Sequence, residues 1–393
     1  MEFPRCMSST TVRCCTTAAI AASMLLAGTA WAGPREQAKR IHDRIAGVPP
    51  DAAVLTAMEA DIAAGRAVDA AYRAMEHPAF YSVTLKNLAT PWTNRDRTVF
   101  APLNDYTATF IGMVRDDVPM NELLSADVLY VGRASLGLPA ASPASNDHFV
   151  EMERRHVDLQ AGLERRAQSG VYGLPPEATA GVTTTRAAAQ AFFVAGTNRA
   201  MFRFTLLNHL CRDLEEIGDT SRPVDRIRQD VSRSPGGDSR LFLNNCVGCH
   251  AGMDPMAQAY AYYDYDEAQG RLVYSAGTVR PKYASNADTF RPGFVTRDDR
   301  WTNYWRQGQN ALLGWDAALP GGGAGAKSLG AELAKSDSFA SCQVEKVFRT
   351  VCLRPPLDAA DRAQVDTMAS AFRAGGYRLK RVFAESAAYC MGQ

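Results

Sequence analysis

The chain has almost no net charge, with 43 Lys and Arg residues against 42 Asp and Glu residues among 393. It contains no block of basic residues, so it lacks the electrostatic footprint of a nucleic-acid-binding protein. Beyond residue 32 it also lacks an apolar run of the roughly 20 residues that span a bilayer. Hydrophobic residues make up 46% and charged residues 22%, which excludes a disordered chain. A globular protein of two to three domains, each of about 150 residues, is expected.

The first 32 residues differ from the rest of the chain. Arg5 and Arg13 precede an apolar stretch from Ala18 to Gly28, and the segment ends in Ala30-Trp31-Ala32. A basic start, a short apolar centre and a small-x-small end are typical of a cleaved secretory signal. The apolar stretch, about 11–15 residues, is too short for a membrane anchor. The sequence therefore predicts an exported, periplasmic protein without a transmembrane anchor after cleavage.

Cysteine is scarce, and two of the cysteines form one motif with a histidine. Of nine Cys residues, six lie beyond the signal, and two of these belong to Cys246-Val247-Gly248-Cys249-His250. This Cys-x-x-Cys-His pattern is the attachment motif of c-type haem. Composition alone gives roughly 0.003 chance matches in a chain of this length. We therefore expect one covalent haem c, with thioethers to Cys246 and Cys249 and with His250 as the proximal ligand of the haem iron.

Two other uses of the motif are weaker but stay open. A zinc site needs a fourth ligand, and the nearest outside candidates are His209 and Cys211. A thioredoxin-like redox pair is expected near a βαβ unit, and the surrounding sequence has no such pattern.

The motif also leaves the sixth ligand of a haem iron open. The carbonyl of Pro255 is a candidate acceptor for the second nitrogen of His250. The candidates for the distal ligand are Met253, Met256, Met368, Met391, His148, His156 and His209.

Apolar residues recur mostly at helical spacing, which predicts a mainly α fold in several parts. One long amphipathic helix is expected from Phe149 to Ser169. A segment rich in Gly, Pro and aromatic residues at 270–325 reads as a loop-rich insert. We expect a signal peptide at 1–32, an N-terminal helical domain at 33–178, a c-type haem domain with the insert at 179–325, and a C-terminal helical domain at 326–393 with helices near 338–351, 359–374 and 378–390.

The residues around the haem motif resemble a known family. The run from Cys246 to Asp266 is similar to the planctomycete-type cytochrome c family, in which Met-Asp-Pro and then a helix ending in Phe/Tyr-Asp follow the haem motif. The stretch Phe339–Phe348 resembles the closing domain of that family. The resemblance implies a cytochrome c-like haem domain with flanking helical domains, many of unknown function, and a Cys211–Cys342 disulfide. Neither the insert nor Cys352 and Cys390 belong to the family pattern.

The four cysteines outside the motif suggest two disulfides in an oxidising compartment. Cys342 and Cys352 lie at the ends of a predicted helix of about 15 Å, which is too long for a disulfide between them. Short connections make neighbouring helices antiparallel, so the first and third C-terminal helices run parallel. This arrangement places Cys352 beside Cys390.

Taken together, these features predict an exported monohaem c-type cytochrome that transfers single electrons with a redox partner protein. One alternative is a haem enzyme with an open sixth site, of the peroxidase or oxygenase kind. Another is a haem-bearing accessory subunit of a larger periplasmic complex, because roughly 200 residues precede the motif. The sequence leaves open whether the protein turns over a substrate, and it leaves the oligomeric state open.

Overall fold

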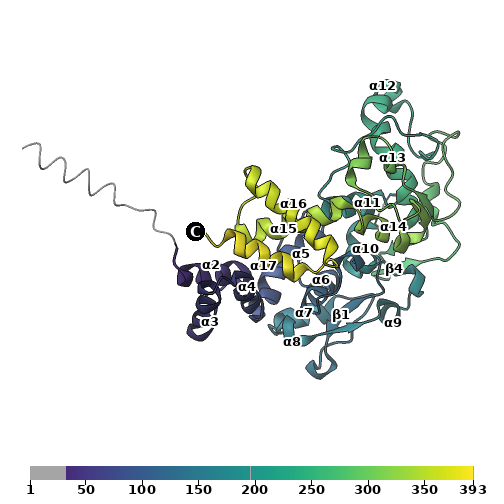
Figure 1. The fold of residues 1–393 in the computed structure, drawn as a ribbon. Coiled ribbons are helices and arrows are strands. Elements are labelled where there is room, and N and C mark those ends of the chain that lie inside the picture. The colour runs from purple at the N-terminus through teal and green to yellow at the C-terminus, as the bar shows by residue number, and fades with distance from the viewer. Residues whose placement is uncertain (1–31, 195, 393) are drawn as a thin grey trace, which may run out of the picture.

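The structure is a computed structural model that describes residues 32–194 and 196–392. The predicted signal therefore lies outside the described residues except for Ala32. The fold is mainly helical, as expected, with small antiparallel sheets between the helices (Figure 1). Within the described part of the chain, no helix is both long and apolar enough to cross a membrane.

The α-helices run in chain order from the N-terminal group to the C-terminal group. Their bounds are α2 Pro34–Ala46, α3 Ala52–Ala63, α4 Ala67–Met75, α5 Lys86–Ala89, α6 Asp105–Arg115, α7 Asp147–Arg154, α8 Leu159–Gly162, α9 Gln168–Tyr172, α10 Arg186–Phe192, α11 Arg199–Thr205, α12 Ser239–Leu241, α13 Val247–Ala257, α14 Gly325–Ala334, α15 Asp337–Cys352, α16 Ala359–Ala374 and α17 Leu379–Cys390.

The strands form three separate two-stranded antiparallel sheets. These sheets are β1 Leu129–Gly132 with β2 Leu163–Arg166, β3 Tyr263–Asp266 with β4 Arg271–Tyr274, and β5 Arg300–Thr302 with β6 Gly322–Ala324. The β3–β4 sheet ties the start of the predicted insert to the residues just before it, and the β5–β6 sheet pairs two segments within the insert. The insert thus has few regular elements, as its composition indicates, yet it is tied down at both of its ends.

The two ends of the described chain pack together. Helices α2 and α4 contact α17, and α3 packs on α2 and α4 (Figure 1). The guanidinium of Arg40 donates to the carbonyl of Met391 at 2.7 Å, and that of Arg44 donates to the carbonyl of Cys390 at 2.6 Å. These carbonyls lie at the C-terminus of α17, where a helix has no intrahelical donors left and cations are favoured. The N-terminal helices therefore cap and cover the last helix.

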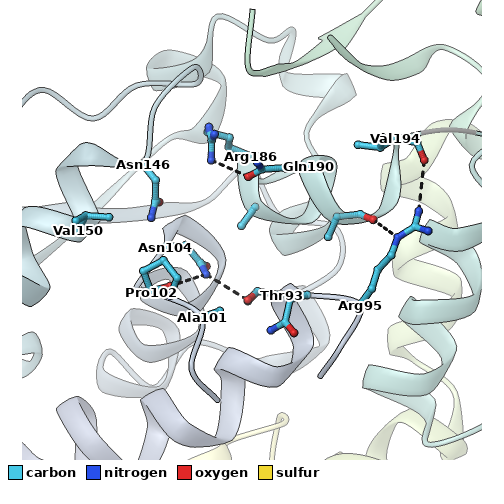
Figure 2. Close-up of a pocket in the computed structure, with 13 residues that line it drawn as sticks. Thr93, Arg95, Ala101, Pro102, Asn104, Asn146, Val150, Arg186, Gln190 and Val194 are labelled. Carbon is cyan, nitrogen blue, oxygen red and sulfur yellow. Dashed lines mark hydrogen bonds between the residues drawn. The ribbon is translucent and has the colours of Figure 1, made fainter. Parts of the chain in front are cut away.

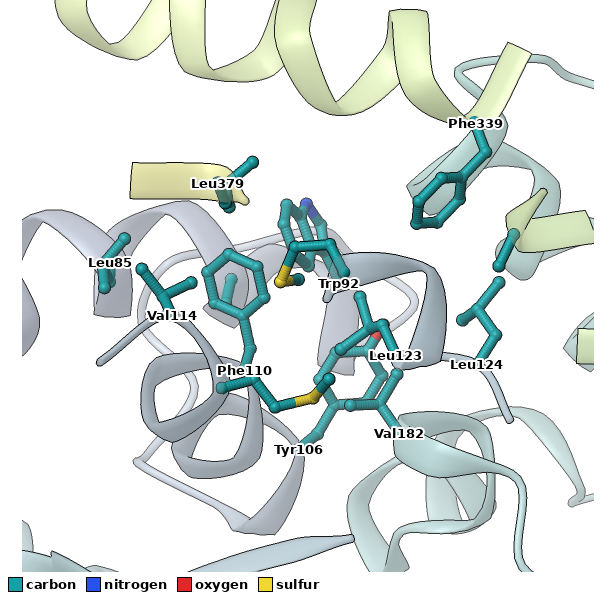
Figure 3. Packing of buried hydrophobic residues seen from close by; sticks show 14 of the residues in the cluster. Leu85, Trp92, Tyr106, Phe110, Val114, Leu123, Leu124, Val182, Phe339 and Leu379 are labelled. Carbon is teal, nitrogen blue, oxygen red and sulfur yellow. The ribbon is translucent and has the colours of Figure 1, made fainter. Parts of the chain in front are cut away.

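One apolar core includes residues from every predicted domain. Figure 3 shows Phe110, Val182 and Phe339 around the same interior, with Leu379 nearby. All four side chains are at least 98% buried. This shared core joins the segments on either side of residues 178 and 325. The domain boundaries expected at these two positions stay predictions.

The long helix predicted from Phe149 to Ser169 is wrong. Helix α7 ends at Arg154, and His156 adopts a positive φ of 51°. The chain then forms the short helix α8 and strand β2, which pairs with β1 so that Leu163 faces Gly132. Strand pairing buries Leu163 completely, and this tertiary contact outweighs a helical pattern carried mostly by exposed charged residues.

The C-terminal prediction is confirmed. Helices α15, α16 and α17 lie where the sequence predicts them, and α15 contacts both of the others. The two predicted disulfides are present as well. The Cα atoms of Cys211 and Cys342 are 5.3 Å apart, and those of Cys352 and Cys390 are 5.5 Å apart.

Candidate haem-attachment site at the start of helix α13

The motif lies where a widened helical turn passes into α13. The Asp238 carboxylate accepts from the backbone N–H of Arg240 and caps α12. The segment Phe242–Cys246 is a single π-helical stretch, and α13 continues from it without a break. Such π turns occur often at functional sites. The spacing of Cys246, Cys249 and His250 places all three on one side of the helix.

A small apolar cluster packs against the start of α13. Its core residues are fully or nearly buried, and Cys246 packs against them at the edge. The guanidinium of Arg233 stacks over the ring of Phe242, with 4.9 Å from Cζ to the ring centroid. The cluster fixes the first turn of α13 while the motif side stays partly open. Its buried members are Ile227, Val231, Phe242, Val247 and Ala251.

The two motif cysteines are the free cysteines of the described chain, and both are partly exposed. The thiol of Cys249 donates to the carbonyl of Leu214 at 3.3 Å, and the N–H of Asp219 donates to the carbonyl of Gly248 at 3.0 Å. Burial raises the pKa of the Cys249 thiol, and the carboxylates of Glu215 and Asp213 raise it further. A reactive redox cysteine has the opposite shift, a lowered pKa.

His250 has one engaged and one unengaged ring nitrogen. Its Nδ1 lies 3.1 Å from Oδ1 of Asp254, one turn further along α13. Within the part of the chain that the structure describes, Nε2 has no hydrogen-bond partner. The side chain keeps 19% of its surface exposed. The Pro255 carbonyl, a candidate acceptor for this histidine, is not the partner of Nδ1, which lies within reach of the Asp254 carboxylate instead.

Asp254 is the centre of a buried charged cluster. Its side chain has no exposed surface and pairs with Arg199, whose Nε lies 2.7 Å from Oδ1. The opposite edge of Arg199 contacts Asp230 through Nη1 at 2.7 Å and through Nη2 at 2.8 Å. Burial acts to raise the pKa of Asp254, but the charges of Arg199 and Arg228 hold it well below its usual range. The carboxylate is therefore ionised in spite of its burial.

The predicted insert covers the back of the motif. The indole of Trp305 is fully buried and lies against Gly252, two residues after the histidine. The amide of Asn310 donates to the carbonyl of Ile217 at 2.7 Å, and that of Gln309 donates to the carbonyl of Gly218. These bonds hold the segment that in turn binds the backbone of Gly248. The insert is thus part of the support of α13.

The tyrosines that follow the motif serve the protein core. Tyr260 and Tyr263 are buried against Phe193, with ring centroids 5.5 Å and 5.7 Å away. The hydroxyl of Tyr263 donates to the carbonyl of Ala178 at 2.7 Å. Tyr262 belongs to a small separate cluster with Tyr283. These three tyrosines therefore lie in ordinary packing.

Several candidates for a distal ligand are engaged elsewhere. Both ring nitrogens of His148 have backbone partners, the carbonyl of Pro139 at 2.6 Å and the N–H of Gly132 at 2.8 Å. Nε2 of His209 lies 2.6 Å from the hydroxyl of Tyr106 in a fully buried pair. The sulfur of Met368 accepts from Ser386 inside the C-terminal helices. Of the two histidines only His148 has both ring nitrogens engaged, because Nδ1 of His209 is buried without a hydrogen-bond partner among the described residues.

A cavity lies away from the motif, between α10 and the segment before α6 (Figure 2). Its volume is about 620 Å³. The guanidiniums of Arg95 and Arg186 flank it, and the amide of Asn104 in its wall is already bonded to Thr93 and to the carbonyl of Pro102. Its 13 lining residues include no Asp, Glu, His or Cys. The cavity therefore presents no carboxylate, imidazole or thiol to a small molecule.

The motif residues fit covalent haem better than they fit zinc. Two unpaired thiols and an imidazole with a free Nε2 form the donor set of a c-type haem site. A structural zinc site needs four Cys, His or acidic ligands. Among the residues that the structure describes, no three such side chains come close enough to hold a metal ion.

Comparison of the chain with protein-family models, with curated proteins and with solved structures gives no match. The resemblance to the planctomycete-type cytochrome c family therefore stays a prediction from the sequence.

Proposed function

We propose that this chain is an exported c-type cytochrome with one haem, which transfers single electrons. Cys246 and Cys249 would hold the porphyrin through thioethers, and His250 would bind the iron through Nε2. When bound, the haem supplies a one-electron Fe(III)/Fe(II) couple. The observation that carries the proposal is the contrast among the six cysteines beyond the signal: four are paired, and the two of the motif are free beside His250.

Two further features support the proposal. Disulfides are typical of oxidising compartments such as the periplasm, where the signal-like start would direct the chain. In the turns before the motif, Leu241 and Leu243 expose 44% and 57% of their surface. Apolar side chains of this kind next to a redox centre suit the brief, weak contacts that electron-transfer partners make.

A haem protein with an open sixth position is the second candidate. It is favoured by one observation: His148, His209 and Met368 all have other partners. An iron with five ligands binds carbon monoxide or peroxide readily, whereas an iron with two protein ligands does not. The two candidate functions share the haem-attachment site. They differ in whether the sixth coordination position of the iron is filled by the protein.

Kinetics and potentiometry of the haem-loaded protein separate the two candidates. We would produce the full chain, signal included, in a bacterium that matures c-type cytochromes, and purify it from the periplasm. Electron transfer predicts a reversible one-electron titration, a low-spin ferrous spectrum and slow carbon monoxide binding. Fast carbon monoxide binding together with peroxide-dependent oxidation of a small donor would overturn the electron-transfer proposal in favour of the second candidate.

A further inference from the structure

The hydrogen bond between His250 and Asp254 fixes the tautomer of the histidine. A carboxylate can only accept, so at 3.1 Å the Nδ1 of His250 is the donor and carries the proton. In the neutral imidazole Nε2 then keeps a lone pair, and this is the form of the ring that binds a metal. The tautomer required of a ligand is therefore set by this chain itself.

The carboxylate is fixed more firmly than the histidine. Both oxygens of Asp254 contact Arg199, at 2.7 Å from Nε and 3.0 Å from Nη2, and the backbone N–H of Arg228 adds a bond at 3.3 Å. Arg199 cannot turn away, because its second edge forms a bidentate pair with Asp230. A planar guanidinium between two carboxylates leaves little rotational freedom to any of the three groups.

We propose that Asp254, clamped by Arg199, is a positioning residue that orients the His250 ring and makes it a stronger donor to the iron. This inference rests on the haem function proposed above and adds a role for a residue outside the Cys-x-x-Cys-His motif. A carboxylate partner raises the basicity of a ligand histidine more than a neutral carbonyl does. A more basic ligand stabilises Fe(III) over Fe(II), so Asp254 holds the midpoint potential down.

The test compares two matched substitutions at the two edges of Arg199. Asp254→Asn keeps an oxygen for Nδ1 but removes the charge, whereas Asp230→Asn disturbs the same cluster without touching His250. We expect Asp254→Asn to favour the ferrous form about tenfold, a rise of 59 mV for a one-electron couple. Asp230→Asn is expected to change the ratio of ferrous to ferric protein at a given potential less than twofold. Asp254→Glu, which restores the charge, is expected to return most of the shift.

Equal potentials for wild type, Asp254→Asn and Asp230→Asn would overturn the positioning role while leaving the haem function intact. Absence of covalent haem from the wild-type protein in the same preparations would overturn the haem function itself. A third measurement uses the wild-type chain without haem, so it depends neither on haem attachment nor on the folding of a variant. In the haem-free wild-type chain, ¹⁵N NMR should show His250 protonated at Nδ1, and protonation at Nε2 alone would contradict the inference.

Discussion

Replacing Gly252 by Ala tests how the insert supports the motif helix. A Cβ at this position would lie 1.9 Å from Nε1 and 2.2 Å from Cε2 of Trp305. Carbon and nitrogen atoms in contact normally lie about 3.5–4.0 Å apart, so the indole or α13 must move by roughly 1.5 Å. Trp305 is fully buried and has little room to move.

The two energetic effects of this substitution oppose each other. Forcing an extra methyl into a packed core costs about 1–3 kcal/mol. Alanine is better than glycine inside a helix by roughly 0.5–1 kcal/mol. The overlap with Trp305 is severe, so the cost lies near its upper value, and we expect Gly252→Ala to lower the free energy of unfolding by about 2–2.5 kcal/mol, the difference between these terms. Urea denaturation followed by circular dichroism measures it.

Gly170 in α9 provides the matched control. A Cβ there meets no atom within 4 Å, and its φ is not positive. Gly170→Ala should therefore leave the protein as stable or stabilise it by up to about 1 kcal/mol. In a Trp305→Leu background the cost of Gly252→Ala should shrink, because the atoms it meets are gone. If Gly252→Ala stabilises the wild-type protein as much as Gly170→Ala does, the described packing of the insert on α13 is incorrect.

The remaining predictions concern the disulfides, acid stability and the choice of histidine. Replacing Cys352 and Cys390 by Ala opens a loop with a sequence separation of 38, and replacing Cys211 and Cys342 opens one of 131. Loop entropy predicts that the free energy of unfolding falls by about 4 kcal/mol for the first pair and by about 5 kcal/mol for the second. Unchanged midpoints of urea denaturation would contradict both disulfides. Asp361 accepts bonds from Arg354, the N–H of Leu357 and Tyr389, which hold its pKa below its usual value. A lowered carboxylate pKa stabilises the fold at neutral pH, and this effect declines as the pH falls below about 4 toward the lowered pKa of the folded state. Asp361→Asn should therefore be less stable than wild type at pH 7, and the gap should be smaller at pH 2; a gap independent of pH would refute this. His250→Ala should abolish a c-type absorption spectrum, whereas His156→Ala, at an exposed position, should leave it unchanged; the reverse result would assign the wrong ligand.

Features that depend on local spacing could be read from the sequence. Pro49-Pro50 and Asp51, which separate α2 from α3, form a recognisable helix break and cap, and the Asp51 carboxylate accepts from the N–H of Val54 at 2.8 Å. The three C-terminal helices follow from their apolar repeat, and their short connections bring Cys352 to Cys390. The contact between Asp254 and His250 could also be predicted from the sequence, because Asp254 stands four residues after His250 on the same helix.

Features that depend on distant contacts could not be read in this way. Arg199 is 55 residues before Asp254, and no local pattern links them. The strand at Leu163–Arg166 exists because it pairs with β1, whereas its own residues suit a helix equally well. Trp305 meets Gly252 only because the insert folds back over α13. In each case a long-range contact decides the local structure or the partner.

The most direct test of the proposed function is mass spectrometry of the peptide that carries residues 246–250. The full chain, produced with its signal where c-type haem is attached, should yield this peptide with one haem bound to Cys246 and Cys249. The Cys246→Ser/Cys249→Ser variant should yield the same peptide without haem, while both disulfides stay intact. An unmodified wild-type peptide, or one with a Cys246–Cys249 disulfide, would contradict the account.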